Sequence, residues 1–134
     1  MSGDAAMLAK GTTALVTGGS GGIGSALVRM LAGTGVHAIA LSNDREKLAL
    51  LDGVPNVETV FMDVTDAEGL QRAFADRPID ILVNAAGVLG VTGTLYSVPH
   101  ASARRIVDVN VVGIHNCLSA VVPGMVRSPS MSDF

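Results

Sequence analysis

The residues in this chain whose types and spacing best suit chemistry form a glycine-rich run at 16–27, VTGGSGGIGSAL. Gly18 permits a tight turn with a positive φ angle, and Gly22 lets the backbone approach a pyrophosphate closely. Gly24 lets a following helix pack closely against the preceding strand. The first amides of that helix and its dipole attract negative charge, and Ser20 adds a hydroxyl donor. The pattern predicts a turn that cradles phosphate groups; the alternative is a glycine turn with no ligand.

Such a turn needs a strand before it and a helix after it, and the flanking sequence indicates both. Residues 12–17 are apolar and β-branched, which is typical of a strand. After the glycines, Ile23, Leu27, Met30 and Leu31 recur at helical spacing. Similar patterns predict further strands at 36–42, 57–62 and 79–84, and helices at 44–51 and 66–77, where Asp66 is a candidate N-cap and Leu70 and Phe74 share a face.

Strands that alternate with helices predict a three-layer, Rossmann-like α/β fold with a doubly wound parallel sheet. We expect the sheet to be truncated after about four strands, in the order 3-2-1-4. From Pro99 onward the pattern is helical, and we expect two helical pieces with a break or change of direction around 108–110. Residues placed near one side of these helices are Ile106, Val109, Val112, Leu118 and Val122. We expect residues 1–134 to form one incomplete domain with a disordered tail at 128–134.

Composition narrows the classes of function. The chain has 134 residues, a net charge of −3 and 16% charged residues, so it has no basic patch and we expect no nucleic-acid partner. Cys117 is the only cysteine, which fits a reducing compartment and a small buried hydrophobe. No apolar run approaches the length of about 18 to 20 residues that spans a bilayer, so we expect a cytoplasmic protein with no membrane partner. The histidines do not combine with acids at metal-ligand spacing, so we expect no metal site.

Three motifs in one order carry a family resemblance. The TGxxxGxG spacing at 17–24, NAAG at 84–87 and VNVVG around Asn110 resemble the short-chain dehydrogenase/reductase family. The resemblance covers the chain from about Lys10 to about Arg127. It implies that the dinucleotide is bound by Gly18, Ser20, Gly22, Ile23 and Gly24.

The resemblance also assigns the remaining cofactor contacts. Asp63, followed by Val64, is implied to contact the adenine ring; without the resemblance, Asp63 could equally be a strand-end residue or a helix cap. The backbone of Asn84, Ala85, Ala86 and Gly87 is implied to border the cofactor ribose, and the Asn84 side chain is implied to help hold the central sheet.

The end of the second predicted strand should decide between NAD and NADP. An acid there accepts the ribose 2′-hydroxyl of NAD, whereas an arginine favours the 2′-phosphate of NADP. The corresponding positions here are Ser42 and Asn43, so we favour NADP over NAD. Asp44 suits a helix N-cap. Arg45 and Lys47 either meet a phosphate or are surface charges.

The family reaction is hydride transfer between a nicotinamide and an alcohol or carbonyl. Asn110 matches the asparagine of the family's proton relay and is our catalytic candidate; alone it could be a hydrogen-bonded kink. The family's Tyr-x-x-x-Lys pair is missing, because the only tyrosine is Tyr96 and His100 stands four residues later.

We therefore expect the cofactor-binding half of an NAD(P)-dependent oxidoreductase of small carbonyl or alcohol substrates, inactive alone. The alternatives are a non-catalytic dinucleotide-binding or regulatory module and an inactive fragment. The resemblance further implies a possible homo-oligomer formed through the helix that carries Asn110.

Overall fold

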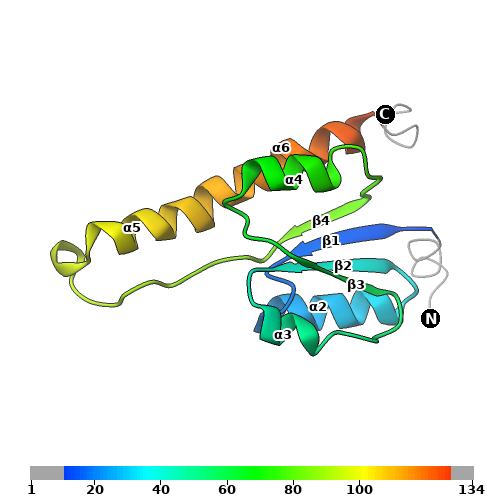
Figure 1. Ribbon diagram of the computed structural model, residues 1–134, viewed down its shortest axis with the longest axis horizontal. Coiled ribbons are helices and arrows are strands. Elements are labelled where there is room, and N and C mark those ends of the chain that lie inside the picture. The colour runs from blue at the N-terminus through cyan, green and yellow to red at the C-terminus, as the bar shows by residue number, and fades with distance from the viewer. Residues whose placement is uncertain (1–10, 128–134) are drawn as a thin grey trace.

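The computed structural model describes residues 11–127, and its centre is a four-stranded parallel sheet (Figure 1). The strands are β1 (Thr13–Thr17), β2 (His37–Ser42), β3 (Val57–Phe61) and β4 (Ile81–Asn84). They lie in the order β3-β2-β1-β4, as predicted. The tail predicted at 128–134 lies outside the described residues.

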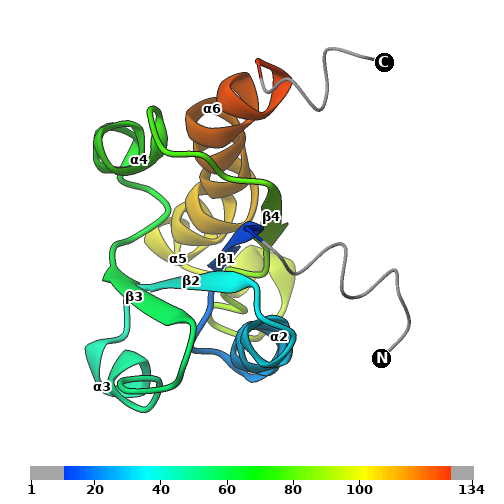
Figure 2. The ribbon, with the colours of Figure 1, turned by 90° about the vertical axis from the view of Figure 1, so that its right-hand side faces the viewer.

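Helices cover both faces of the sheet and make three layers (Figure 2). The helices α2 (Gly22–Gly33) and α3 (Arg45–Ala49) lie on one face, and α4 (Ala67–Phe74) and α6 (Gly113–Val126) lie on the other. Successive strand residues point to opposite faces, so Leu15 joins the core under α4 and α6 while Val16 joins the core under α2 and α3. The two central strands, β1 and β2, are buried on both faces and read as nearly continuous apolar runs. The predicted α/β architecture is confirmed.

The buried face of α2 differs from the predicted one. Gly24, Val28 and Ala32 face the sheet, whereas Ile23 and Met30 are 76% and 61% exposed. A Cβ atom on Gly24 would collide with the carbonyl oxygen of Gly18. This contact fixes the rotation of the helix about its axis, and small residues then face inward whatever the positions of the larger apolar ones.

The C-terminal helical region is continuous and does not change direction. It runs through α5 (His100–Val107), a π-helical turn at Asp108–Val112 and α6. The irregularity therefore lies where the sequence predicted a break, but it is a widened turn within a single helix (Figure 1). The buried residues Val109, Gly113, Cys117 and Val121 recur every four positions, and two residues of the predicted apolar face, Val112 and Leu118, lie off this stripe and are each 42% exposed.

Beyond the π turn, other residues occupy the core. Cys117 and Val121 are buried there, and α6 packs closely on α4. Burial raises the pKa of the Cys117 thiol to about 11, which agrees with the predicted small hydrophobe.

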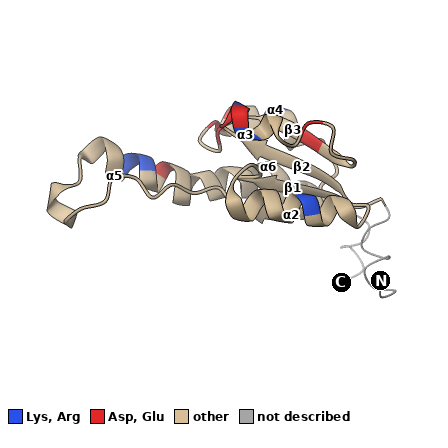
Figure 3. Ribbon diagram, turned by 90° about the horizontal axis from the view of Figure 1, so that it is seen from below, with Lys and Arg blue, Asp and Glu red and all other residues tan. Residues whose placement is uncertain are grey.

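The length of this helix corrects one sequence expectation. The 27 residues His100–Val126 are long and apolar enough to cross a membrane by length and composition, with a mean hydropathy of 1.5 in the most apolar window. The α6 part carries no charged residue (Figure 3). A helix that covers a sheet meets the same criteria when its inner face is apolar, and 33% of that window is buried inside the protein.

Candidate functional site

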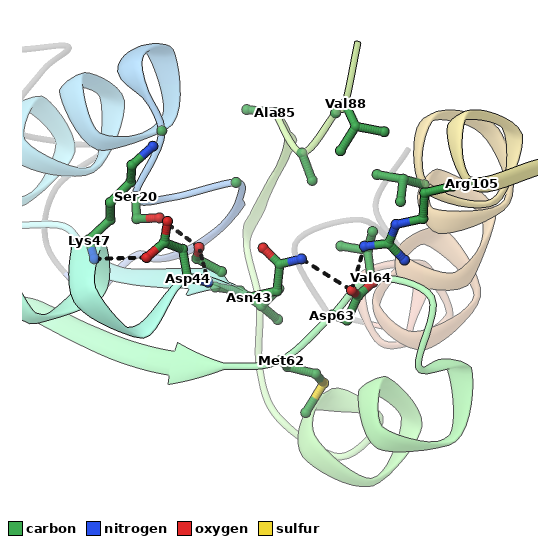
Figure 4. A pocket seen from close by; sticks show the side chains of 17 residues that line it. Ser20, Asn43, Asp44, Lys47, Met62, Asp63, Val64, Ala85, Val88 and Arg105 are labelled. Atoms are coloured by element: carbon green, nitrogen blue, oxygen red, sulfur yellow. Dashed lines mark hydrogen bonds and ion pairs between the residues drawn. The ribbon is translucent and has the colours of Figure 1, made fainter. Parts of the chain in front are cut away.

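The carboxyl ends of all four strands meet at one edge of the sheet, and the site lies there. Thr17 pairs with Leu41 on one side and with Asn84 on the other, and Ser42 pairs with Phe61. The segments that follow these strands therefore surround a common space, which is where ligands bind in open parallel sheets. A cavity of about 210 Å³ occupies it (Figure 4).

The glycine turn forms one wall of this cavity through backbone packing. Gly18 has a φ of +62°, and a Cβ atom there would lie 2.7 Å from the carbonyl oxygen of Ala85. A Cβ on Gly22 would instead meet nothing within 4 Å. No side chain caps the first turn of α2, and that turn contains no acid. The arrangement leaves an uncapped helix N-terminus with open space beside it, which suits an anion such as a pyrophosphate.

Two hydroxyls mark the end of β2. The Oγ atoms of Ser20 and Ser42 lie 2.6 Å apart, and Ser42 Oγ accepts a hydrogen bond from the backbone amide of Asp44 at 3.1 Å. The Asp44 carboxylate accepts from the amide of Lys47 and caps α3, as predicted. Because Asp44 is engaged in this way, the end of β2 presents hydroxyls to the cavity in place of a free carboxylate.

The two cations of α3, which the sequence analysis could not place, have different environments. The Arg45 guanidinium stacks on the ring of Phe61, 3.8 Å from its centroid. Lys47 lines the cavity, and within residues 11–127 no carboxylate forms an ion pair with it. Lys47 is therefore the cation available to a ligand phosphate.

Asp63 stands on the opposite wall and is held by hydrogen bonds. Its Oδ2 accepts from Arg105 at 2.8 Å and from Asn43 at 3.2 Å, and its Oδ1 accepts from Thr65. Burial raises the pKa of this carboxyl group, but the hydrogen bonds, led by that from Arg105, outweigh burial and hold the pKa well below its usual range. Asp63 is therefore an ionised acceptor facing the cavity.

The turn after β4 is fixed by two polar side chains. Thr17 Oγ1 accepts from the amide of Ala86 at 3.3 Å. Asn110, in the π turn, accepts from the amide of Val88 at 2.8 Å and donates to its carbonyl at 2.9 Å. Asn110 thus holds the backbone, which agrees with the hydrogen-bonded alternative; its proton-relay role remains a prediction.

The expected role of Asn84 in holding the sheet stays a prediction. Its Oδ1 is buried and accepts no hydrogen bond from residues 11–127. The strand that carries it, β4, pairs on one side with β1 and has no neighbour on its other side in the described part of the chain.

The structure brings most of the predicted cofactor residues to one cavity. Those that line it are Gly18, Ser20, Ser42, Asn43, Asp63, Val64, Ala85, Ala86 and Gly87. Those outside its lining are Gly22, Ile23, Gly24, Asn84 and Asn110. Lining residues that the prediction did not include are Gly21, Leu41, Asp44, Lys47, Met62, Val88, Arg105 and Val109. Arg105 had no local signal, because only the packing of α5 brings it to Asp63.

Comparisons with known proteins agree with this geometry. The model of the short chain dehydrogenase family matches residues 12–131. An uncharacterised short-chain type dehydrogenase/reductase of Sinorhizobium fredii is 32% identical over 114 residues, which are 85% of this chain and 46% of that protein. An L-xylulose reductase of Mesocricetus auratus is 32% identical over 129 residues, 90% of this chain and 53% of that protein.

A solved structure indicates the same family. That of a putative short chain dehydrogenase from Pseudomonas syringae matches with a TM-score of 0.81 at 26% identity, covering 91% of this chain and 56% of that one. The chain thus spans about half the length of these relatives. The matched region contains the glycine turn, the acidic strand end and the π-helical asparagine, and the chain belongs to the short-chain dehydrogenase/reductase family.

Proposed function

We propose that this chain binds a nicotinamide dinucleotide, NADP in preference to NAD, as the cofactor-binding part of an oxidoreductase. The whole protein would transfer hydride between the nicotinamide and an alcohol or carbonyl substrate. The observation that carries the proposal is the uncapped N-terminus of α2, open at Gly22, beside a cavity that ends at an ionised carboxylate.

We assign different parts of the dinucleotide to the two walls of the cavity. The amides at the start of α2 would bind the pyrophosphate, since this helix end concentrates unpaired N–H groups. Asp63 would accept a hydrogen bond from the adenine amino group, and Val64 would contact the ring. Asn110 would fix the turn after β4 through Val88, so that the backbone at 84–87 borders the ribose. When bound, the nicotinamide supplies or receives the hydride.

The NADP preference rests on the end of β2. Ser20 and Ser42 present hydroxyls there, and Lys47 lines the cavity without an ion-pair partner among the described residues. A 2′-phosphate would gain a charge-assisted contact with Lys47, whereas the 2′-hydroxyl of NAD would find no free carboxylate at Ser42.

We also propose that the 134-residue chain binds the cofactor without turning substrate over. Tyr96 lies in the short turn Leu95–Ser97 and is 92% exposed, and the chain has no other tyrosine to act as a proton donor. Both polar groups of the Asn110 amide are occupied by Val88.

Fluorescence titration of the purified chain with NADPH and with NADH tests this function. We expect NADPH to bind more tightly, and the preference to fall about tenfold in Lys47→Ala, because one charge-assisted contact is lost. Arg72→Ala is the matched control, since Arg72 is an exposed cation on α4 that pairs only with Glu68. A chain that binds neither dinucleotide would contradict the function, and equal affinities would contradict only the NADP preference.

A further inference from the structure

The acceptor capacity of Asp63 is already filled by the protein. Thr65 donates to Oδ1 twice, from its amide at 3.0 Å and from its hydroxyl at 2.8 Å. Asn43 and Arg105 both donate to Oδ2. An ionised carboxylate offers about four acceptor positions. A ligand donor that reaches Asp63 must therefore replace one of these partners.

Asn43 is the partner that can yield most easily. Its bond is the longest of the four, at 3.2 Å, and its amide is neutral, whereas Arg105 makes a charge-assisted bond at 2.8 Å. The two bonds from Thr65 close a local turn at Asp63. Figure 4 shows the Asn43 amide pointing from the end of β2 across the cavity to Asp63, while Arg105 reaches the same carboxylate from α5 on the far side. The amide thus stands in the space between the two walls.

We propose that Asn43 is a specificity-determining residue for the base of the nucleotide. Its side-chain amide occupies, on Asp63 Oδ2, the position that the 6-amino group of a purine takes when it binds. A 6-amino purine binds by exchange, its amino group replacing the Asn43 amide. A 6-oxo purine offers only an acceptor at that position and leaves the Asn43–Asp63 bond in place. This inference rests on the proposed function, because it takes the cavity as the site of the adenosine half.

The exchange has a consequence for affinity. The contact of adenine with Asp63 is gained only after the contact of Asn43 with Asp63 is lost, so Asn43 lowers the affinity for adenine nucleotides below what the carboxylate alone would give. Removal of the amide should therefore strengthen binding of a 6-amino purine and leave a 6-oxo purine nearly unaffected. A residue with a merely structural role would weaken both.

ADP and IDP are the probes for this contact, since they differ only at the 1,6 edge of the base and lack a 2′-phosphate. ADP has a 6-amino donor and an N1 acceptor, whereas IDP has a 6-oxo acceptor and an N1–H donor. Calorimetric titration of the chain gives the ratio of the two dissociation constants, Kd of IDP over Kd of ADP. In Asn43→Ala we expect this ratio to rise about threefold to tenfold through tighter ADP binding, the size of one net hydrogen bond. In Asp63→Asn we expect it to fall to about one or below. In the double variant, Asn43→Ala should no longer change the ratio.

A direct observation complements the ratio. We expect the side-chain amide signals of Asn43 in ¹⁵N–¹H spectra to shift when ADP is added and to stay in place with IDP. A ratio that is unchanged or lowered in Asn43→Ala overturns the inference while the proposed function stands. Failure of ADP, NADPH and NADH alike to bind overturns the proposed function itself and the inference with it.

Discussion

The two walls of the cavity are held in different ways. The glycine wall is backbone against backbone: Gly24 abuts Gly18, and Gly18 abuts the turn at Ala85 with no room for a side chain. The opposite wall is held by side chains, with Asn43 and Arg105 converging on Asp63. One wall is rigid because atoms fill it, and the other is held by hydrogen bonds that a ligand can exchange.

This difference separates two kinds of substitution. At the glycine wall an added side chain should clash with the backbone or fill the phosphate position, with large effects on folding or on phosphate binding. Changes at the side-chain wall should have smaller effects, on the preference between nucleotides or on the pH dependence of stability. The reason is that Arg105 and Asp63 are partly exposed and water screens their interaction.

The largest effect is expected at Gly24. In Gly24→Ala the new Cβ would collide with the Gly18 carbonyl and lie 2.7 Å from its carbon, so the helix or the turn must shift. We expect the free energy of unfolding in urea to fall by about 2–4 kcal/mol. Gly33→Ala, in the same helix with nothing within 4 Å of its Cβ, is the control and should not destabilise. Equal losses in both variants would show that the wall is not sterically closed.

Gly22→Val separates phosphate binding from folding on the same wall. The space beside Gly22 is empty of protein, so the side chain should fill the pyrophosphate position without a clash. We expect NADPH affinity to fall about a hundredfold, or about 2.7 kcal/mol, while the urea midpoint stays close to that of the unchanged chain. Unchanged NADPH affinity would contradict the phosphate cradle.

Ser42→Asp tests whether the end of β2 selects between NADP and NAD. The buried hydroxyl of Ser42 contacts Ser20 and accepts from the amide of Asp44, and a carboxylate could keep both contacts. It would also accept the ribose 2′-hydroxyl of NAD and repel a 2′-phosphate. We expect the ratio of NADPH to NADH affinity to fall about tenfold, or about 1.4 kcal/mol, in fluorescence titrations. If the ratio does not fall, residue 42 is not the selecting position.

The smallest effect is expected in the acid stability set by Arg105. The folded-state pKa of Asp63 lies below the ordinary value of 3.8, so its contacts stabilise the fold above that pH and this contribution is lost as pH falls below it. Arg105→Ala should lower stability at about pH 7 by up to about 1 kcal/mol and reduce the loss between about pH 4 and pH 2. Urea midpoints across this range measure both effects.

Arg104→Ala is the neighbouring control for this prediction. Arg104 is 82% exposed and lies 3.8 Å from Asp108, away from Asp63. Its replacement should leave the pH profile of stability unchanged. A profile that changes equally in both variants would assign the effect to the total charge of α5 rather than to the Arg105–Asp63 pair.

Local patterns predicted the glycine wall well and the side-chain wall only in part. Gly18 and Gly24 are close in sequence and act through backbone geometry, so their spacing alone indicates the turn. The two long-range partners of Asp63, Asn43 and Arg105, are 20 and 42 residues away, and only Asn43 was a candidate from the sequence. Arg105 could not be found because its contact with Asp63 depends on how α5 packs in the folded protein.

Periodicity also failed in two helices for identifiable reasons. In α2 the Gly24–Gly18 contact, and not the larger apolar side chains, decides which face is buried. In the C-terminal helix the buried residues Val109, Gly113, Cys117 and Val121 recur every four positions, and the predicted face placed Val112 and Leu118 off this stripe. In both helices small residues, Gly24 and Gly113, lie on the buried face, so a search for large apolar residues at helical spacing does not find that face.

The sequence by itself determined the alternation of strands and helices and the glycine turn, because these follow from short-range patterns. The strand order was expected from the known order of the doubly wound fold, which the family resemblance implies. Only the tertiary structure decided which side chains meet across the cavity: that Lys47 lines it while Arg45 stacks on Phe61, and that Asn43 and Arg105 share one oxygen of Asp63. Such contacts join residues far apart in the chain, and their geometry is fixed by the packing of whole elements.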